Sequence, residues 1–147
     1  MKTFSFDKAK LYWTCQIGGW SLYSFYMMTA LLANNRLNVR SAFDVIFTSI
    51  CLLLLSHAYR HVIVKRKWMQ LLFGKLLLRM TSSSVLLSVL ALPFSWLSSL
   101  LFDPERLATE FTQGGILQAI LGGTFLFFCW SLGYFLYHYV SNYNRSL

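Results

Sequence analysis

The sequence contains one long apolar stretch that decides the fold, FDVIFTSICLLLLSHAYRHVIV at residues 43–64. A hydrocarbon core about 30 Å thick takes roughly 20 helical residues to cross, which is the length of this stretch. Three further runs of comparable length lie at residues 11–33, 76–102 and 114–140. The sequence therefore predicts an all-α integral membrane protein, a four transmembrane helix bundle whose antiparallel helices run up and down with short loops.

The composition belongs to the same class. Of 147 residues, 56% are apolar and only 12% are charged, and the mean hydropathy is +0.53. A soluble domain is about a quarter charged, and this chain is too apolar for a disordered segment or a nucleic-acid-binding tail. We therefore expect one transmembrane domain over residues 1–147, with the bilayer as its partner and no nucleic acid.

The basic residues divide ten to three between the two sides of a four-span chain. By the positive-inside rule both termini are cytoplasmic. The ten are Lys2, Lys8, Lys10, Arg60, Lys65, Arg66, Lys67, Lys75, Arg79 and Arg145, and the three are Arg36, Arg40 and Arg106. The run at 11–33 is too long and too aromatic for a cleaved signal peptide, so it is interpreted as a retained span.

The loops carry two further expectations. Trp68 follows the basic loop and is expected to anchor the chain at the membrane interface, where the neighbouring cations favour anionic headgroups. The acidic segment at 103–110 is predicted to be a loop that opens with a capped turn at Asp103 and Pro104.

His57, Arg60 and His61 share one face of the second run, at spacings of three and four residues. Together with His138 of the fourth run, the two histidines are candidate ligands for a cofactor such as haem. Two other interpretations remain open. The side chains can reach the headgroups or cap helix ends, or Arg60 can belong to an inward-facing switch.

Helix packing in the third and fourth runs is expected to depend on a few residues. Gly115, Ala119 and Gly123 recur every four positions, which lets helix backbones approach closely either inside the bundle or in a dimer. Pro93 is expected to kink the third helix because it removes one backbone hydrogen bond.

No pattern of catalytic residues or metal ligands is evident. Cys15, Cys51 and Cys129 lie in apolar runs without CxxC spacing, so they predict neither a disulfide framework nor a zinc site and are expected to pack as buried thiols. The glycine pairs lie in helical runs, not after strands, and do not form nucleotide loops. We therefore expect no catalytic site, metal or cofactor, and no enzyme activity of this chain alone.

Aromatic and polar motifs nevertheless occur in a distinctive order. They are Tyr12-Trp13, Gln16-Ile-Gly-Gly-Trp20 with Tyr23, His57-Ala-Tyr-Arg60 with Trp68, and Tyr134-Phe-Leu-Tyr137-His-Tyr139 with Asn142-Tyr-Asn-Arg145. This series resembles the four-helix membrane region that precedes the catalytic part of bacterial LytS/YehU-type sensor histidine kinases. The resemblance covers essentially the whole chain.

The resemblance implies a sensor and anchoring domain of the bacterial inner membrane. It implies a kinase part after residue 147, absent from this sequence, which would form a homodimer, autophosphorylate with ATP and pass the phosphoryl group to a LytTR-type response regulator. The alternative is a stand-alone four-helix membrane protein that binds haem, quinone or lipid between the second and fourth spans.

Overall fold

The structure is a computed structural model that describes residues 8–146, with side chains described for residues 9–143. This part of the chain forms five α-helices and one short 3-10 helix, and it contains no strand. In chain order the elements are α1 (Lys8–Ala33), α2 (Val39–Lys65), η1 (Trp68–Gln70), α3 (Phe73–Phe102), α4 (Pro104–Glu110) and α5 (Gln113–Ser146). The predicted all-α class is confirmed.

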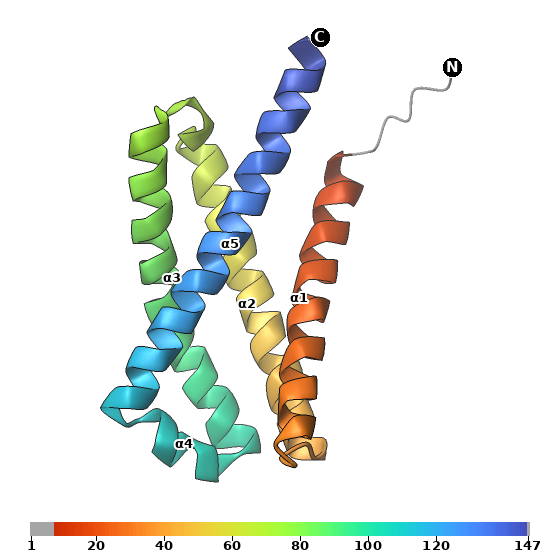
Figure 1. Cartoon of the computed structure of the whole chain (residues 1–147), viewed down its shortest axis with the longest axis vertical. Helices are drawn as coiled ribbons and strands as arrows, with labels where there is room; N and C mark the ends of the chain where they lie inside the picture. The colour runs from red at the N-terminus through yellow and green to blue at the C-terminus, as the bar shows by residue number, and fades with distance from the viewer. Residues whose placement is uncertain (1–7, 147) are drawn as a thin grey trace.

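The long helices run alternately up and down (Figure 1). α1 lies against α2, α2 against α3, and α3 against α5, while α5 crosses the face of the bundle diagonally. α1 begins and α5 ends at the same end, which we call the termini end. The short α4 lies at the opposite end, which we call the α4 end.

Three of the described helices are long and apolar enough to cross a membrane: α2, α3 and the part of α5 at Gln113–Tyr143. α1 does not meet that criterion, so the structure supports a membrane-type helical chain without establishing the fourth predicted span. The difference has a chemical origin, because α1 carries Lys10, Gln16 and several Trp and Tyr side chains with polar atoms.

Local signals in the sequence account for the short connection between α1 and α2. Asn35 adopts a left-handed conformation with φ 54°, which an asparagine tolerates better than most residues. Asn38 then caps α2, since its Oδ1 accepts from the Ser41 backbone N–H at 2.8 Å, and the Asn38 N–H donates to Ser41 Oγ at 2.8 Å. This reciprocal capping box fixes where α2 begins.

The segment predicted to be an acidic loop is instead a helix. α4 follows Asp103 directly, with Pro104 at its first turn, and the Asp103 side chain makes no capping hydrogen bond. Proline favours the first helical position because its φ is already helical. Arg106 and Glu110 add an ion pair one turn apart. The loop prediction for 103–110, with its capped turn, was therefore wrong.

The bundle buries many small polar side chains and leaves many large apolar ones exposed. Six serines are almost completely buried: Ser56, Ser84, Ser88, Ser98, Ser99 and Ser131. Large apolar side chains such as Leu22, Phe25 and Leu78 remain about 70% exposed. This distribution suits helices in lipid, where small residues mediate helix contacts and the outer surface needs no polar groups.

Three of these six serines satisfy their hydroxyls within their own helix. Ser84 Oγ donates to the Met80 carbonyl at 2.7 Å, and Ser131 Oγ donates to the Phe127 carbonyl at 2.8 Å. Ser88 differs, because its Oγ donates at 2.8 Å to the Ile120 carbonyl of α5. The bundle therefore contains buried hydroxyls that donate within their own helix and others that donate to a neighbouring helix.

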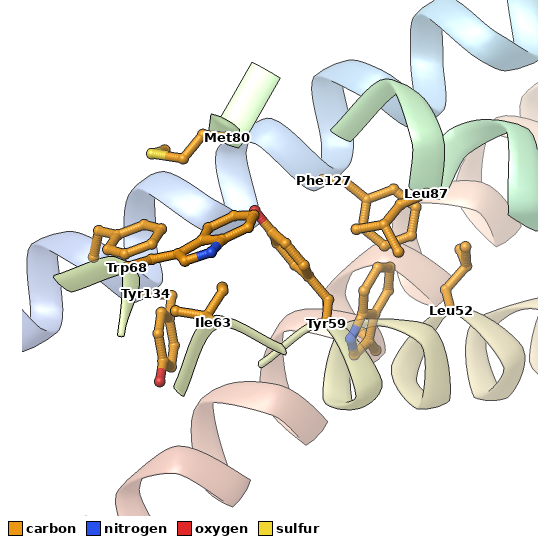
Figure 2. Packing of buried hydrophobic residues seen from close by; sticks show 10 residues of the cluster. Leu52, Tyr59, Ile63, Trp68, Met80, Leu87, Phe127 and Tyr134 are labelled. Atoms are coloured by element: carbon orange, nitrogen blue, oxygen red, sulfur yellow. The ribbon is translucent and has the colours of Figure 1, made fainter. Parts of the chain in front are cut away.

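An aromatic cluster fills the bundle toward the termini end (Figure 2). Trp68 is only 6% exposed and meets the Tyr59 ring edge-on at 6.0 Å. Ile63 and Met80 are also buried in this cluster. The expected interface anchor is thus a core residue, because η1 turns the indole toward the bundle.

Pro93 lies inside α3, which remains one helix from Phe73 to Phe102. Figure 1 shows that α3 changes direction part-way along its length, on the side toward α4. A proline within a helix is a sufficient cause of such a bend.

Candidate functional site

A hydrogen-bonded network connects three helices near the termini end. At its centre is Gln16, which is only 2% exposed. Its Nε2 donates to Tyr12 Oη at 2.9 Å and to Ser56 Oγ at 3.0 Å. Its Oε1 accepts from Trp130 Nε1 at 2.7 Å. One amide side chain therefore joins α1 to both α2 and α5.

Two further contacts extend this network along α1 and α2. Trp20 Nε1 donates to Ser56 Oγ at 3.2 Å, and Tyr12 Oη is hydrogen-bonded to His57 Nδ1 at 3.1 Å. We call the six residues the polar junction: Tyr12, Gln16, Trp20, Ser56, His57 and Trp130. Its members are neutral or aromatic, and Gln16 has both of its polar atoms engaged.

Arg60 lies directly beside the polar junction. Its guanidinium carbon is 4.2 Å from the centre of the Tyr12 ring, and its side chain also lies close to that of Tyr134. Arg60 Nε is buried without a hydrogen-bond partner, and no carboxylate among the described residues lies within ion-pair distance. The Arg60 charge is therefore stabilised by aromatic rings without a carboxylate to balance it.

A cavity of about 260 Å³ opens between α1 and α5 beside the same residues. We call it the aromatic cavity. It is lined by Leu11, Tyr12, Cys15, Gln16, Cys129, Trp130, Gly133, Tyr134 and Tyr137. Cys15 and Cys129 are exposed, which corrects the expectation that the cysteines pack as buried thiols, and Cys51 is half-buried.

The predicted face of His57, Arg60 and His61 is divided by the structure. His57 stacks on Trp13 with ring centres 5.1 Å apart, and Arg60 lies over Tyr12, so both contact α1. His61 is exposed. Two of the three residues therefore contact α1.

The three histidines are not brought together. His138 packs against Tyr134 of its own helix, with ring centres 4.5 Å apart. Within the described residues no group of three or more His, Cys, Asp or Glu is placed to hold a metal ion. None of His57, His61 and His138 lines the aromatic cavity, so the cavity gives no support to haem ligation by them.

The small residues of α5 contact partners within the same chain. A Cβ added to Gly123 would lie 2.5 Å from Ser88 Oγ, and one added to Gly115 would lie 2.5 Å from the Thr109 carbonyl oxygen. Ala119 is exposed. Gly123 and Gly115 therefore support close packing of α5 on α3 and on the end of α4.

A second polar cluster lies at the α4 end, and sequence reasoning missed it. Arg106 Nη1 is 2.7 Å from Asp44 Oδ2, and Arg106 Nε is 2.9 Å from Glu110 Oε1. Ser99 Oγ donates to Glu110 Oε2 at 2.9 Å, and Ser98 Oγ donates to the Asp44 carboxylate. We call these five residues the ion cluster. It ties α2 and α3 to α4.

The ion cluster had one signal in the sequence. Asp44 is an acid inside a predicted span, and an ionised carboxylate there requires a cation. Arg106 supplies that cation from α4, far away in the chain. Burial raises the pKa of Glu110 above the ordinary glutamate value, although the Ser99 hydrogen bond and the Arg106 charge both oppose the rise.

Comparisons with known proteins identify no relative, since no family model, no curated protein and no solved structure matches the chain.

Proposed function

We propose that this chain is a signal-input and anchoring domain of a membrane sensor histidine kinase of the LytS/YehU type. The observation that carries the proposal is the polar junction. Tyr12, Gln16, Trp20 and His57 belong to the motifs on which the resemblance rests, and they lie in one network that reaches α5 through Trp130. A contact set of this kind allows a change at α1 or α2 to move α5.

In the proposed mechanism α5 transmits the signal. It is held at two heights, by Gly123 against Ser88 of α3 and by Trp130 against Gln16 of α1. When the contact between Trp130 and Gln16 changes while that between Gly123 and Ser88 holds, the part of α5 beyond Trp130 tilts or rotates. Such a device needs two packings of similar energy, and the bend at Pro93 supplies a second place where the bundle can adjust.

The proposed placement is four spans with both termini in the cytoplasm of a bacterial inner membrane. α1 begins and α5 ends at one end of the bundle, and the basic connection after α2 lies at that end as well (Figure 1). α1 has the length of a span, and its polar atoms lie partly in the polar junction, away from lipid. Reporters fused after Leu147 and within 65–75 should be cytoplasmic, and one within 103–110 should be exported. An exported C-terminal reporter would contradict four spans.

The functional proposal is tested in a full-length kinase that carries this domain. Gln16→Leu removes the centre of the polar junction, and Gln118→Leu makes the same change at an exposed position of α5. We expect Gln16→Leu to change autophosphorylation, measured with ATP in proteoliposomes, several-fold, and Gln118→Leu to leave it unchanged. Trp130→Phe, which keeps the ring and removes the indole donor, is the milder second variant. Unaltered output in Gln16→Leu and Trp130→Phe would refute the proposal.

A further inference from the structure

The aromatic cavity has walls suited to a hydrocarbon chain. Its walls include the rings of Tyr12, Trp130 and Tyr134 and the side chain of Leu11. The polar atoms of Gln16, which also contributes to the wall, are engaged inside the protein. The walls therefore offer apolar surface, and the cavity is open to the outside between α1 and α5.

A cation lies behind two of these wall residues. Arg60 packs over the Tyr12 ring and lies close to the Tyr134 side chain, and both of these residues line the cavity. Buried or half-buried charges in proteins are ordinarily paired, because an unpaired charge away from water is costly. Arg60 has no carboxylate partner within the described part of the chain. The site is therefore complementary to an anion.

The surroundings add to the positive charge. Lys10 precedes Leu11 and Tyr12 of the cavity wall, and Lys65 lies a little more than one turn after Arg60 on α2. Both are exposed at the termini end. An apolar cavity with a guanidinium behind its wall and cations near it is typical of a site for an anionic amphiphile, since basic pockets between helices bind lipid headgroups.

We propose that the aromatic cavity and Arg60 together bind one anionic phospholipid, with an acyl chain between α1 and α5 and the phosphate against the guanidinium. The guanidinium offers N–H donors in a planar fork that matches phosphate oxygens. The inference names a ligand class for the input site proposed above and rests on that proposal only for its consequence in signalling. Because Trp130 and Tyr12 belong to both the cavity and the polar junction, a bound chain would set the spacing of α1 and α5.

Binding is tested with the purified chain in detergent, without any kinase activity. Native mass spectrometry measures how much phosphatidylglycerol is retained, against phosphatidylcholine, oleic acid and inorganic phosphate as separate probes. We expect one phosphatidylglycerol per chain, at least about tenfold better retained than phosphatidylcholine. Both lipids carry the phosphate, but the choline cation of phosphatidylcholine would lie beside Arg60 and the neighbouring cations, and like charges placed together disfavour binding. Oleic acid and inorganic phosphate should be retained less than phosphatidylglycerol, since each supplies only part of the ligand.

Two pairs of variants separate a specific site from general attraction. Arg60→Gln should weaken phosphatidylglycerol retention about tenfold, while Arg66→Gln removes an exposed cation nearby and should change it less than twofold. Gly133→Leu fills the cavity at a position where an added Cβ meets nothing within 4 Å, and it should abolish retention. Gly122→Leu makes the same change on α5 at an equally open position outside the cavity and should have no effect.

Four kinds of result would overturn the inference. Equal retention of phosphatidylcholine would mean that the acyl chains alone hold the lipid. Equal losses in Arg60→Gln and Arg66→Gln would mean diffuse attraction to the basic end. Equal effects of Gly133→Leu and Gly122→Leu would place the lipid elsewhere. Oleic acid or inorganic phosphate retained as well as phosphatidylglycerol would replace the phospholipid with a free anion. None of these measurements uses kinase output. Lipid binding can therefore be refuted while the proposed function stands, and the proposed function can be refuted while lipid binding stands.

Discussion

Arg106 and Arg60 lie at opposite ends of the bundle and differ in their partners. Arg106 pairs with Asp44 and Glu110, and serine hydroxyls occupy further oxygens of both carboxylates. Arg60 has aromatic neighbours and no carboxylate among the described residues. One arginine thus completes a network within the chain, while the other leaves a charge that a ligand can neutralise. The comparison separates an end of the bundle whose charges are paired, which we call the structural end, from an end with an unpaired arginine, which we call the responsive end in line with the proposed function.

The largest expected effect is the difference in unfolding free energy between the variants Arg106→Gln and Arg60→Gln. Arg106→Gln leaves Asp44, whose side chain is 5% exposed, without its cation. Breaking a buried pair costs about 3–5 kcal/mol, and the partial exposure of Arg106 places the loss near the lower limit, about 3 kcal/mol. Arg60→Gln should cost less than about 1 kcal/mol, the usual worth of a partly exposed cation–π contact. Unfolding in mixed detergent micelles measures both values.

A double variant gives the control for this first comparison. Asp44→Asn with Arg106→Gln removes both charges and should recover part of the lost stability, since the two residues interact directly. Equal losses for Arg60→Gln and Arg106→Gln would abolish the distinction between the two ends.

The next largest effect on stability is expected where α5 packs on α3, between the two ends of the bundle. Gly123→Ala places a Cβ 2.5 Å from Ser88 Oγ and 3.2 Å from Ser88 Cβ, so α3 and α5 must separate or Ser88 must move. Overpacking of this kind costs about 1–3 kcal/mol. Gly122→Ala, which meets nothing within 4 Å, should not destabilise the chain. If the two alanine variants unfold alike, α5 is not held at Gly123.

A smaller loss is expected at the responsive end. Gln16→Leu removes hydrogen bonds to Tyr12, Ser56 and Trp130. Polar contacts between membrane helices contribute about 0.6 kcal/mol each on average, so we expect a loss of about 1–2 kcal/mol in the same unfolding assay. A loss as large as that of Arg106→Gln would make the polar junction a structural element equal to the ion cluster.

The smallest effect is a pH dependence confined to the α4 end. Because burial raises the folded-state pKa of Glu110, the folded protein holds this proton more tightly than the unfolded chain does. The associated stability is present below the ordinary glutamate pKa and is lost as pH rises through the raised value. Glu110→Gln should flatten the stability profile in that window. A profile identical to that of the parent would assign the dependence to another group.

The helical class and the long apolar runs were predictable because they depend on local sequence. A run such as residues 43–64 carries its length and its apolar character wherever it packs. α4 was missed because a helix this short draws support from Asp44 and Ser99, which belong to other elements. The same reason applies to Trp68, whose burial depends on where η1 turns it.

The candidate site was predictable only in its parts. Arg60 and His57 were recognised from their positions near the end of a span, and their contact with α1 is present. Gln16 was recognised only as part of a motif, since one amide in an apolar run does not reveal which helices it joins. The aromatic cavity depends on how α1 and α5 approach each other, and no pattern within one helix records that distance.

The serine hydroxyls have a consequence for the speed of any rearrangement. A hydroxyl that donates to its own helix, as Ser84 does to Met80, keeps its hydrogen bond when the neighbouring helix slides past. Only hydroxyls like that of Ser88, which donates to Ile120 of α5, must break a bond during such a movement. The activation barrier for sliding α5 along α3 should therefore depend strongly on Ser88 and hardly on Ser84, so Ser88→Ala should speed the exchange between two packings even where it leaves their populations unchanged.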